Sequence, residues 1–122
     1  MSMNQIRIRF TFNGRQAVAL LSDNPTTRSM LAHLPVTIPF EDYAGTEKIA
    51  YFPQKLSGEN APDGYAPAAG DITCYGPWGN LAIFYKGRSY SGGLIYMGTI
   101  ESGLDELARQ GSGFDVTIEA VE

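Results

Sequence analysis

Hydrophobic and polar residues alternate strictly near the start of the chain. In the stretch 5–12, every even-numbered residue is isoleucine or phenylalanine, and every odd-numbered one is glutamine, arginine or threonine. Successive side chains of a strand point to opposite faces, so this period of two predicts a half-buried strand. Asn13 and Gly14 follow at once, and both tolerate positive φ, which favours a tight type I′ turn. Residues 16–21 then return as the second strand of a hairpin.

A second hairpin is predicted over residues 70–85. Two mostly apolar segments flank the sequence Pro77-Trp78-Gly79-Asn80, which is typical of a chain reversal. The single tryptophan of the chain stands in this turn rather than inside a strand. The residues 58–70 before it are rich in glycine, proline and asparagine and are predicted to form a loop.

Four further extended segments and two helices complete the pattern. The extended segments are 36–40, a strand within 47–56, 94–100 and 114–120. Asn24 can cap a helix whose first residue is Pro25, and Pro35 ends that element. Ser102 and Asp105 have the spacing of a capping box for a second helix.

These elements predict a mainly β fold of about eight short strands and two short helices, in one domain spanning residues 1–122. Closure into a β-barrel is the natural arrangement, because it removes strand edges that would otherwise seek partners. The apolar faces of the two helices would each cover an open barrel end.

Composition narrows the function classes. The chain is 43% hydrophobic and 18% charged, with a net charge of −4 and scattered basic residues, which argues against nucleic-acid binding. No segment approaches the ~18 apolar residues of a membrane span, and no signal-type apolar run precedes Phe10, so we expect a cytoplasmic protein. The single Cys74 excludes an internal disulfide and is expected to be buried and inert. Neither a metal-ligand spacing nor a cofactor fingerprint is present, so no metal or cofactor is predicted.

Two segments resemble bacterial cyclophilin-like fold proteins. They are Gly70-Asp71-Ile72 through Pro77-Trp78-Gly79-Asn80-Leu81-Ala82-Ile83-Phe84-Tyr85, and Gly98-Thr99-Ile100-Glu101-Ser102-Gly103-Leu104. The resemblance spans nearly the whole chain and implies a cyclophilin-type β-barrel with two capping helices. It supplies no activity. Some relatives are fused to flavodoxin-like domains, which implies an accessory role beside redox proteins as one alternative.

True cyclophilins are prolyl isomerases, which makes isomerisation a second alternative. Their site resembles an arginine followed five residues later by Phe-Met-x-Gln, with a distant tryptophan and histidine. The nearest match here is Phe52-Pro53-Gln54, and the position five residues before Phe52 is Glu47. A carboxylate there cannot supply the cationic donors that hold the substrate, and His33 matches nothing in the pattern. The isomerase reading is therefore disfavoured.

The leading hypothesis is a binding domain for a small molecule or peptide, since aromatic faces pack well on flat ligands and proline rings. The proposed cleft residues are Tyr51, Phe52, Gln54, Tyr75, Pro77 and Trp78, with Glu101 as an acceptor at the edge. The alternatives are that Trp78 clamps its own turn and that Phe52 packs in the core. Arg88 either contacts an anionic ligand or is a solvated turn charge. A homodimer is possible.

Overall fold

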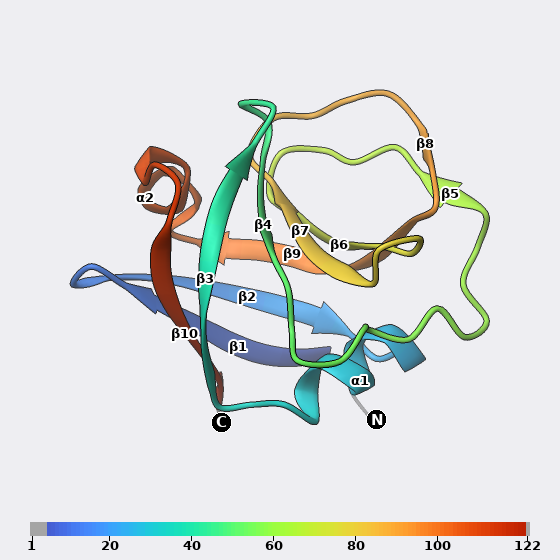
Figure 1. The fold of residues 1–122 in the computed structure, drawn as a ribbon, viewed down its shortest axis with the longest axis horizontal. Helices are drawn as coiled ribbons and strands as arrows, with labels where there is room; N and C mark the ends of the chain where they lie inside the picture. Colours follow the sequence, from blue (N-terminus) through green and yellow to red (C-terminus); the bar gives the residue numbers. More distant parts are fainter. Residues whose placement is uncertain (1–4, 122) are drawn as a thin grey trace.

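Eight antiparallel strands close into a barrel, and the computed structural model describes residues 5–121 (Figure 1). The barrel strands are β1 (Gln5–Phe12), β2 (Arg15–Ser22), β3 (Val36–Tyr43), β4 (Glu47–Ala50), β6 (Asp71–Tyr75), β7 (Asn80–Phe84), β9 (Leu94–Ser102) and β10 (Phe114–Val121). Their order around the barrel is β1-β10-β3-β4-β7-β6-β9-β2, and β2 pairs back to β1. The predicted fold class is confirmed.

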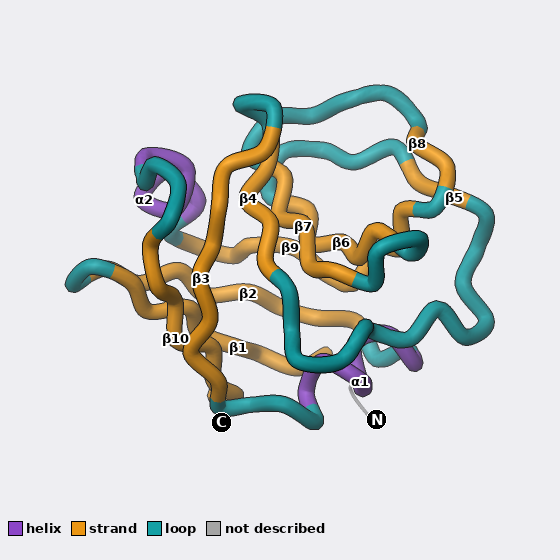
Figure 2. The backbone as a smooth tube through the Cα atoms, viewed as in Figure 1, coloured by secondary structure: helices purple, strands orange, loops and turns teal. Residues whose placement is uncertain are grey.

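The remaining elements lie outside the barrel wall. The helices α1 (Pro25–Leu31) and α2 (Leu104–Arg109) lie on opposite sides of the barrel (Figure 1). The short strands β5 (Gly64–Tyr65) and β8 (Ser91–Gly92) pair with each other and tie together two long loops (Figure 2). These loops connect β4 to β6 and β7 to β9, and they run beside each other because of that pairing.

The first hairpin forms as the alternation predicts. Asn13 and Gly14 have φ angles of +47° and +74°, the left-handed values that a type I′ turn requires. Phe12 therefore faces Arg15 across the turn, and the register continues along both strands. The isoleucine and phenylalanine side chains of β1 from residue 8 onward are buried in the barrel interior.

Helix α1 also begins as predicted. The side-chain oxygen of Asn24 accepts a hydrogen bond from the backbone N–H of Thr27 at 2.8 Å, and Pro25 occupies the first turn. Both features satisfy or remove amide groups that have no partner inside the helix. Met30 is fully buried and packs into the barrel interior, so α1 covers one side of the barrel.

The predicted capping box at Ser102 is wrong. Ser102 is the last residue of β9, and Gly103 stands at the start of α2 with a φ of +88° and no side-chain cap. A Cβ at Gly103 would lie 2.4 Å from the carbonyl oxygen of Gln16 on β2. Close packing of β9 against β2, together with the left-handed turn, decides this helix start.

The strand predicted within 47–56 is β4, which ends at Ala50, before Tyr51 and Phe52. The loop prediction for residues 58–70 needs a correction, because β5 lies inside that stretch. The residues after β4 run beside the β6–β7 hairpin, where the N–H of Leu56 donates to the carbonyl of Gly79 at 2.9 Å. In that hairpin Asn80 belongs to β7 and pairs with Tyr75, so the turn is 76–79.

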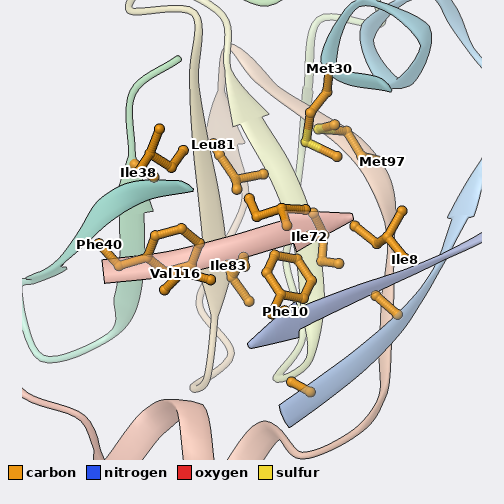
Figure 3. Close-up of a cluster of buried hydrophobic side chains, with 14 of the residues drawn as sticks. Ile8, Phe10, Met30, Ile38, Phe40, Ile72, Leu81, Ile83, Met97 and Val116 are labelled. Atoms are coloured by element: carbon orange, nitrogen blue, oxygen red, sulfur yellow. The ribbon is translucent and has the colours of Figure 1, made fainter. Parts of the chain in front are cut away.

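The structure buries two apolar clusters. The larger fills the barrel interior, and Figure 3 shows part of it around Phe10, Phe40 and Ile72. Cys74 belongs to this cluster, and burial raises the pKa of its thiol to about 11, which makes it unreactive as expected. The smaller cluster is formed by Ile49, Ala82, Phe84 and Leu94, with Tyr65 and Tyr75 packed against it.

The smaller cluster lies on the outer face of the barrel. Ile83 points into the interior cluster, so its neighbours in β7, Ala82 and Phe84, must point outward. Every residue of β7 is buried, which means that both faces of this strand are covered.

A buried lysine fastens the end of α2 to the barrel. The Lys48 side chain is 1% exposed, and its Nζ donates to Asp42 at 3.1 Å, to the Gly111 carbonyl at 3.2 Å, and to the Gln110 carbonyl. Tyr85 donates its hydroxyl to the same Asp42 carboxylate. Burial tends to raise the pKa of Asp42, but these hydrogen bonds outweigh it and the net pKa is lowered.

Replacing this lysine should cost substantial stability. In Lys48→Met, Asp42 loses its cationic partner and two backbone carbonyls lose a donor, and we expect the free energy of unfolding to fall by about 2–3 kcal/mol. Urea denaturation followed by circular dichroism measures this. Lys86→Met, at an exposed position, is the matched control and should change stability little. Equal denaturation midpoints for the two variants would contradict the assigned role of Lys48.

Candidate functional site

A cavity of about 210 Å³ opens on the outer face of the barrel, above the smaller apolar cluster. It lies between β3, β4, the β6–β7 hairpin and the segment that leads through β8 into β9. We call it the Trp78 pocket. Its lining residues are Tyr43, Glu47, Ile49, Tyr75, Trp78, Asn80, Phe84, Arg88, Ser91 and Leu94.

Alternate side chains of β4 and β7 point outward and form the floor of the pocket. On β4, Glu47 and Ile49 point outward into the pocket, whereas Lys48 and Ala50 turn to the opposite face. On β7, Asn80 and Phe84 likewise share the outward face. The floor therefore combines apolar side chains with a carboxyl group and an amide.

Three aromatic side chains form the wall of the pocket. The Trp78 ring meets Tyr75 edge to face, with centroids 5.3 Å apart and an angle of 82° between the planes. It meets Tyr43 in the same manner at 6.3 Å and 90°. These are favoured aromatic geometries, and they hold a tryptophan in place although it is 46% exposed. Trp78 thus braces its own hairpin and also faces an open cavity.

Glu47 is an unusual group for a pocket floor. Its side chain is 9% exposed, and its partner among the described residues is Arg88, whose Nη1 lies 3.7 Å from the nearer carboxylate oxygen. That separation is too long for a hydrogen bond. Burial raises the pKa of Glu47, and this effect outweighs the opposing influence of Arg88. The carboxyl group retains unused hydrogen-bonding capacity.

Asn80 carries a second unused acceptor. The residue is 1% exposed, and its Nδ2 donates to the Leu81 carbonyl at 3.1 Å. Its Oδ1 has no hydrogen-bond partner within residues 5–121. A buried acceptor without a donor costs about 1–3 kcal/mol, so this amide is held at an energetic disadvantage.

Comparison with known proteins gives the chain its family. The model of the cyclophilin-like family matches residues 10–119. The chain belongs to the cyclophilin-like family. Among solved structures, the solution structure of the hypothetical protein AF2241 from Archaeoglobus fulgidus aligns with a TM-score of 0.78 at 18% identity and covers 98% of each chain. At that identity the likeness shows the fold alone. No curated protein matches the sequence.

Two of the predicted site residues of this cyclophilin-like barrel line the pocket, namely Tyr75 and Trp78. Pro77 lies next to them in the turn but does not line the cavity. It is exposed, and its ring lies against Gly93, where an added Cβ would come within 2.9 Å of Pro77 Cδ. Pro77 therefore packs against Gly93 rather than into the cavity.

The residues after β4 do not join the pocket. Tyr51 and Gln54 are exposed, and neither lines the cavity. Phe52 is buried in the interior cluster and contacts His33 of the α1 region at 5.5 Å between ring centroids. The core alternative for Phe52 is thus confirmed. The stretch that echoes the isomerase motif of true cyclophilins does not face the Trp78 pocket.

Glu101 also lies away from the pocket. It forms a bidentate pair with Arg7, with both N···O distances at 3.0 Å, across the β1–β2–β9 side of the barrel. It borders a separate surface depression at the junction of β9 and α2. The predicted acceptor at the cleft edge is instead a surface ion-pair partner.

Sequence reasoning missed Tyr43, Glu47 and Asn80. The available signal for Glu47 was its phase, because it stands two positions from Ile49 on a short strand and therefore shares the same face. Tyr43 and Asn80 carried no comparable signal, since their roles depend on which strands become neighbours. Arg88 lines the pocket, as its predicted contact with a ligand would require.

Other site classes find no support within residues 5–121. No group of His, Cys, Asp and Glu side chains is arranged to hold a metal ion there. In the same part of the chain, no helix is long and apolar enough to cross a membrane.

Glu47 should reduce stability at neutral pH. A carboxyl group with a raised pKa in the folded state stabilises folding below its ordinary pKa of 4.5, and this contribution is lost as the pH rises and the group ionises. We therefore expect Glu47→Gln to unfold at a higher urea concentration than the wild type at pH 7. The difference should vanish below pH 4.5.

The exposed Glu59→Gln is the matched control for the same charge change and should show no such gain. A destabilised Glu47→Gln at pH 7 would mean that the contact with Arg88 outweighs the cost of burial.

Proposed function

We propose that the protein is a binding domain for a small organic ligand, held in the Trp78 pocket. The observation that carries this proposal is the aromatic wall. Trp78 and Tyr43 are 46% and 45% exposed, yet both are fixed by edge-to-face contacts above a buried apolar floor. Large apolar side chains held rigidly at a cavity mouth are typical of ligand sites.

The size of the pocket limits the ligand. A cavity of about 210 Å³ holds about seven water molecules at ~30 Å³ each. Pockets for drug-sized ligands span about 300–1,000 Å³. The pocket therefore suits a compact molecule or one side chain of a peptide, rather than an extended peptide lying in a groove.

A binding role is better supported than prolyl isomerisation. The residues that echo the isomerase motif, Phe52 and Gln54, do not line the pocket. The Glu47 carboxyl group, whose Arg88 partner lies beyond hydrogen-bond distance, is instead a feature that a bound molecule would satisfy. The cytoplasmic location expected from the sequence stays a prediction.

Trp78 offers a direct test because it is the only tryptophan of the chain. A set of small organic molecules is titrated into the protein while its tryptophan emission is recorded. We expect binders to shift or quench that emission. In Trp78→Leu, calorimetry should show their affinity reduced about tenfold, the loss of roughly 1.4 kcal/mol of aromatic contact.

Tyr51→Ala separates this site from the cleft predicted from sequence. Tyr51 is 54% exposed and does not line the pocket, so its removal should leave affinity unchanged. Binders that lose affinity in Tyr51→Ala but not in Trp78→Leu would place the site elsewhere and overturn the proposal.

A further inference from the structure

We propose that the ligand of the Trp78 pocket carries a compact organic cation, such as a substituted ammonium group, and that Glu47 is its counter-ion. This inference rests on the proposed binding function and names the chemical class of the ligand. Two features of the pocket point to a cation: a buried carboxyl group with an incomplete set of partners, and the arrangement of the aromatic rings.

The carboxyl group of Glu47 lacks the partners that a buried charge needs. The neighbouring Lys48 is a buried charge with a complete set of partners, since its Nζ donates hydrogen bonds to Asp42 and to two carbonyl oxygens. Glu47 has an Arg88 nitrogen at 3.7 Å, and the Arg88 side chain is itself 45% exposed. A ligand ammonium can approach the carboxylate to hydrogen-bond distance, about 2.8 Å, and supply the missing compensation.

The aromatic rings form a corner rather than a slot. Tyr43 and Tyr75 stand at 90° and 82° to the plane of Trp78. A flat aromatic ligand could stack on one of these rings at a time. A rounded cation can contact several at once, and the negative faces of aromatic rings attract cations, most strongly for tryptophan. The shape and the electrostatics of the wall therefore favour the same ligand.

The remaining polar group of the floor is also an acceptor. Asn80 Oδ1 has no partner within the described residues, while its Nδ2 is already used by Leu81. This oxygen is closed off from solvent, and as a neutral acceptor it does not select the charge of a ligand. Glu47 is therefore the polar group of the floor on which the charge of the ligand depends.

Arg88 defines the alternative, an anionic ligand. An anion would depend on this half-exposed guanidinium while lying close to the Glu47 carboxylate, which would repel it. We assign Arg88 instead as a competing cation at the rim, because its guanidinium lies 3.7 Å from the Glu47 carboxylate in the free protein.

Three probes of nearly the same shape separate these charges. They are choline, its neutral carbon analogue 3,3-dimethylbutan-1-ol, and the anion 3,3-dimethylbutanoate. Each is titrated into the 122-residue protein, and binding is followed by tryptophan emission and by calorimetry at low and moderate salt. We expect choline to bind at least about tenfold more tightly than the neutral alcohol, and the anion to bind most weakly.

Charge-changing variants then test the two side chains. Glu47→Gln should weaken choline binding about tenfold and leave the neutral alcohol unaffected. Arg88→Gln should strengthen choline binding, since it removes the competing cation. The exposed Glu59→Gln and Lys86→Gln make the same charge changes outside the pocket and should have little effect. Circular dichroism and urea denaturation establish that each variant is folded.

The outcomes distinguish this inference from the proposed function. Equal affinity for choline and the alcohol, tighter binding of the anion, or indifference to Glu47→Gln would overturn the cation assignment while leaving a small-ligand site. If neither these probes nor any of the small organic molecules above perturbs Trp78, both the assignment and the proposed function fail.

Discussion

The structure depends on the burial of one part of the barrel wall on both of its faces. Strands β4 and β7 are buried throughout, and β6 is nearly so, because the interior cluster covers one face and Ile49, Phe84 and Leu94 occupy the other. Outward apolar side chains in these strands must be covered, and the loops joined by the β5–β8 pair provide that cover. The Trp78 pocket is the place where the cover is incomplete. Architecture and candidate site thus have the same physical origin.

The two segments that carry the family resemblance serve different purposes. In the later segment, a Cβ at Gly98 would lie 2.2 Å from the Leu20 carbonyl oxygen, and one at Gly103 would lie 2.4 Å from that of Gln16. Those glycines let β9 pack closely on β2, so this motif is explained by barrel closure. The earlier segment closes the β6–β7 hairpin and also contributes Tyr75, Trp78 and Asn80 to the pocket. A likeness in sequence therefore reports a packing requirement in one place and a candidate site in the other.

Strand β4 buries two adjacent charged residues that have very different surroundings. Glu47 and Lys48 are adjacent and both are buried, but they face opposite sides of the wall. Lys48 meets a carboxylate, two backbone carbonyls and the rings of Tyr85 and Phe114. Glu47 lines the same pocket as the aromatic wall and has an arginine nitrogen at 3.7 Å. The fully paired charge holds the end of α2 in place, whereas the incompletely paired one lies on the floor of the candidate pocket.

The sequence by itself determined the local structure: the alternation of β1, the Asn13-Gly14 turn and the Asn24 cap of α1 all act over a few residues. It also predicted a cleft that includes Tyr75 and Trp78, because aromatic and turn residues cluster in the segment 70–85, and both residues line the candidate pocket. Only the tertiary structure decided that Phe52 enters the core, that Glu101 pairs with Arg7, and that Gly103 rather than Ser102 begins α2. It also brought Tyr43, Glu47 and Arg88 to the pocket from separate segments. The physical reason is that propensity and alternation are local, whereas a pocket depends on which strands become neighbours when the barrel closes.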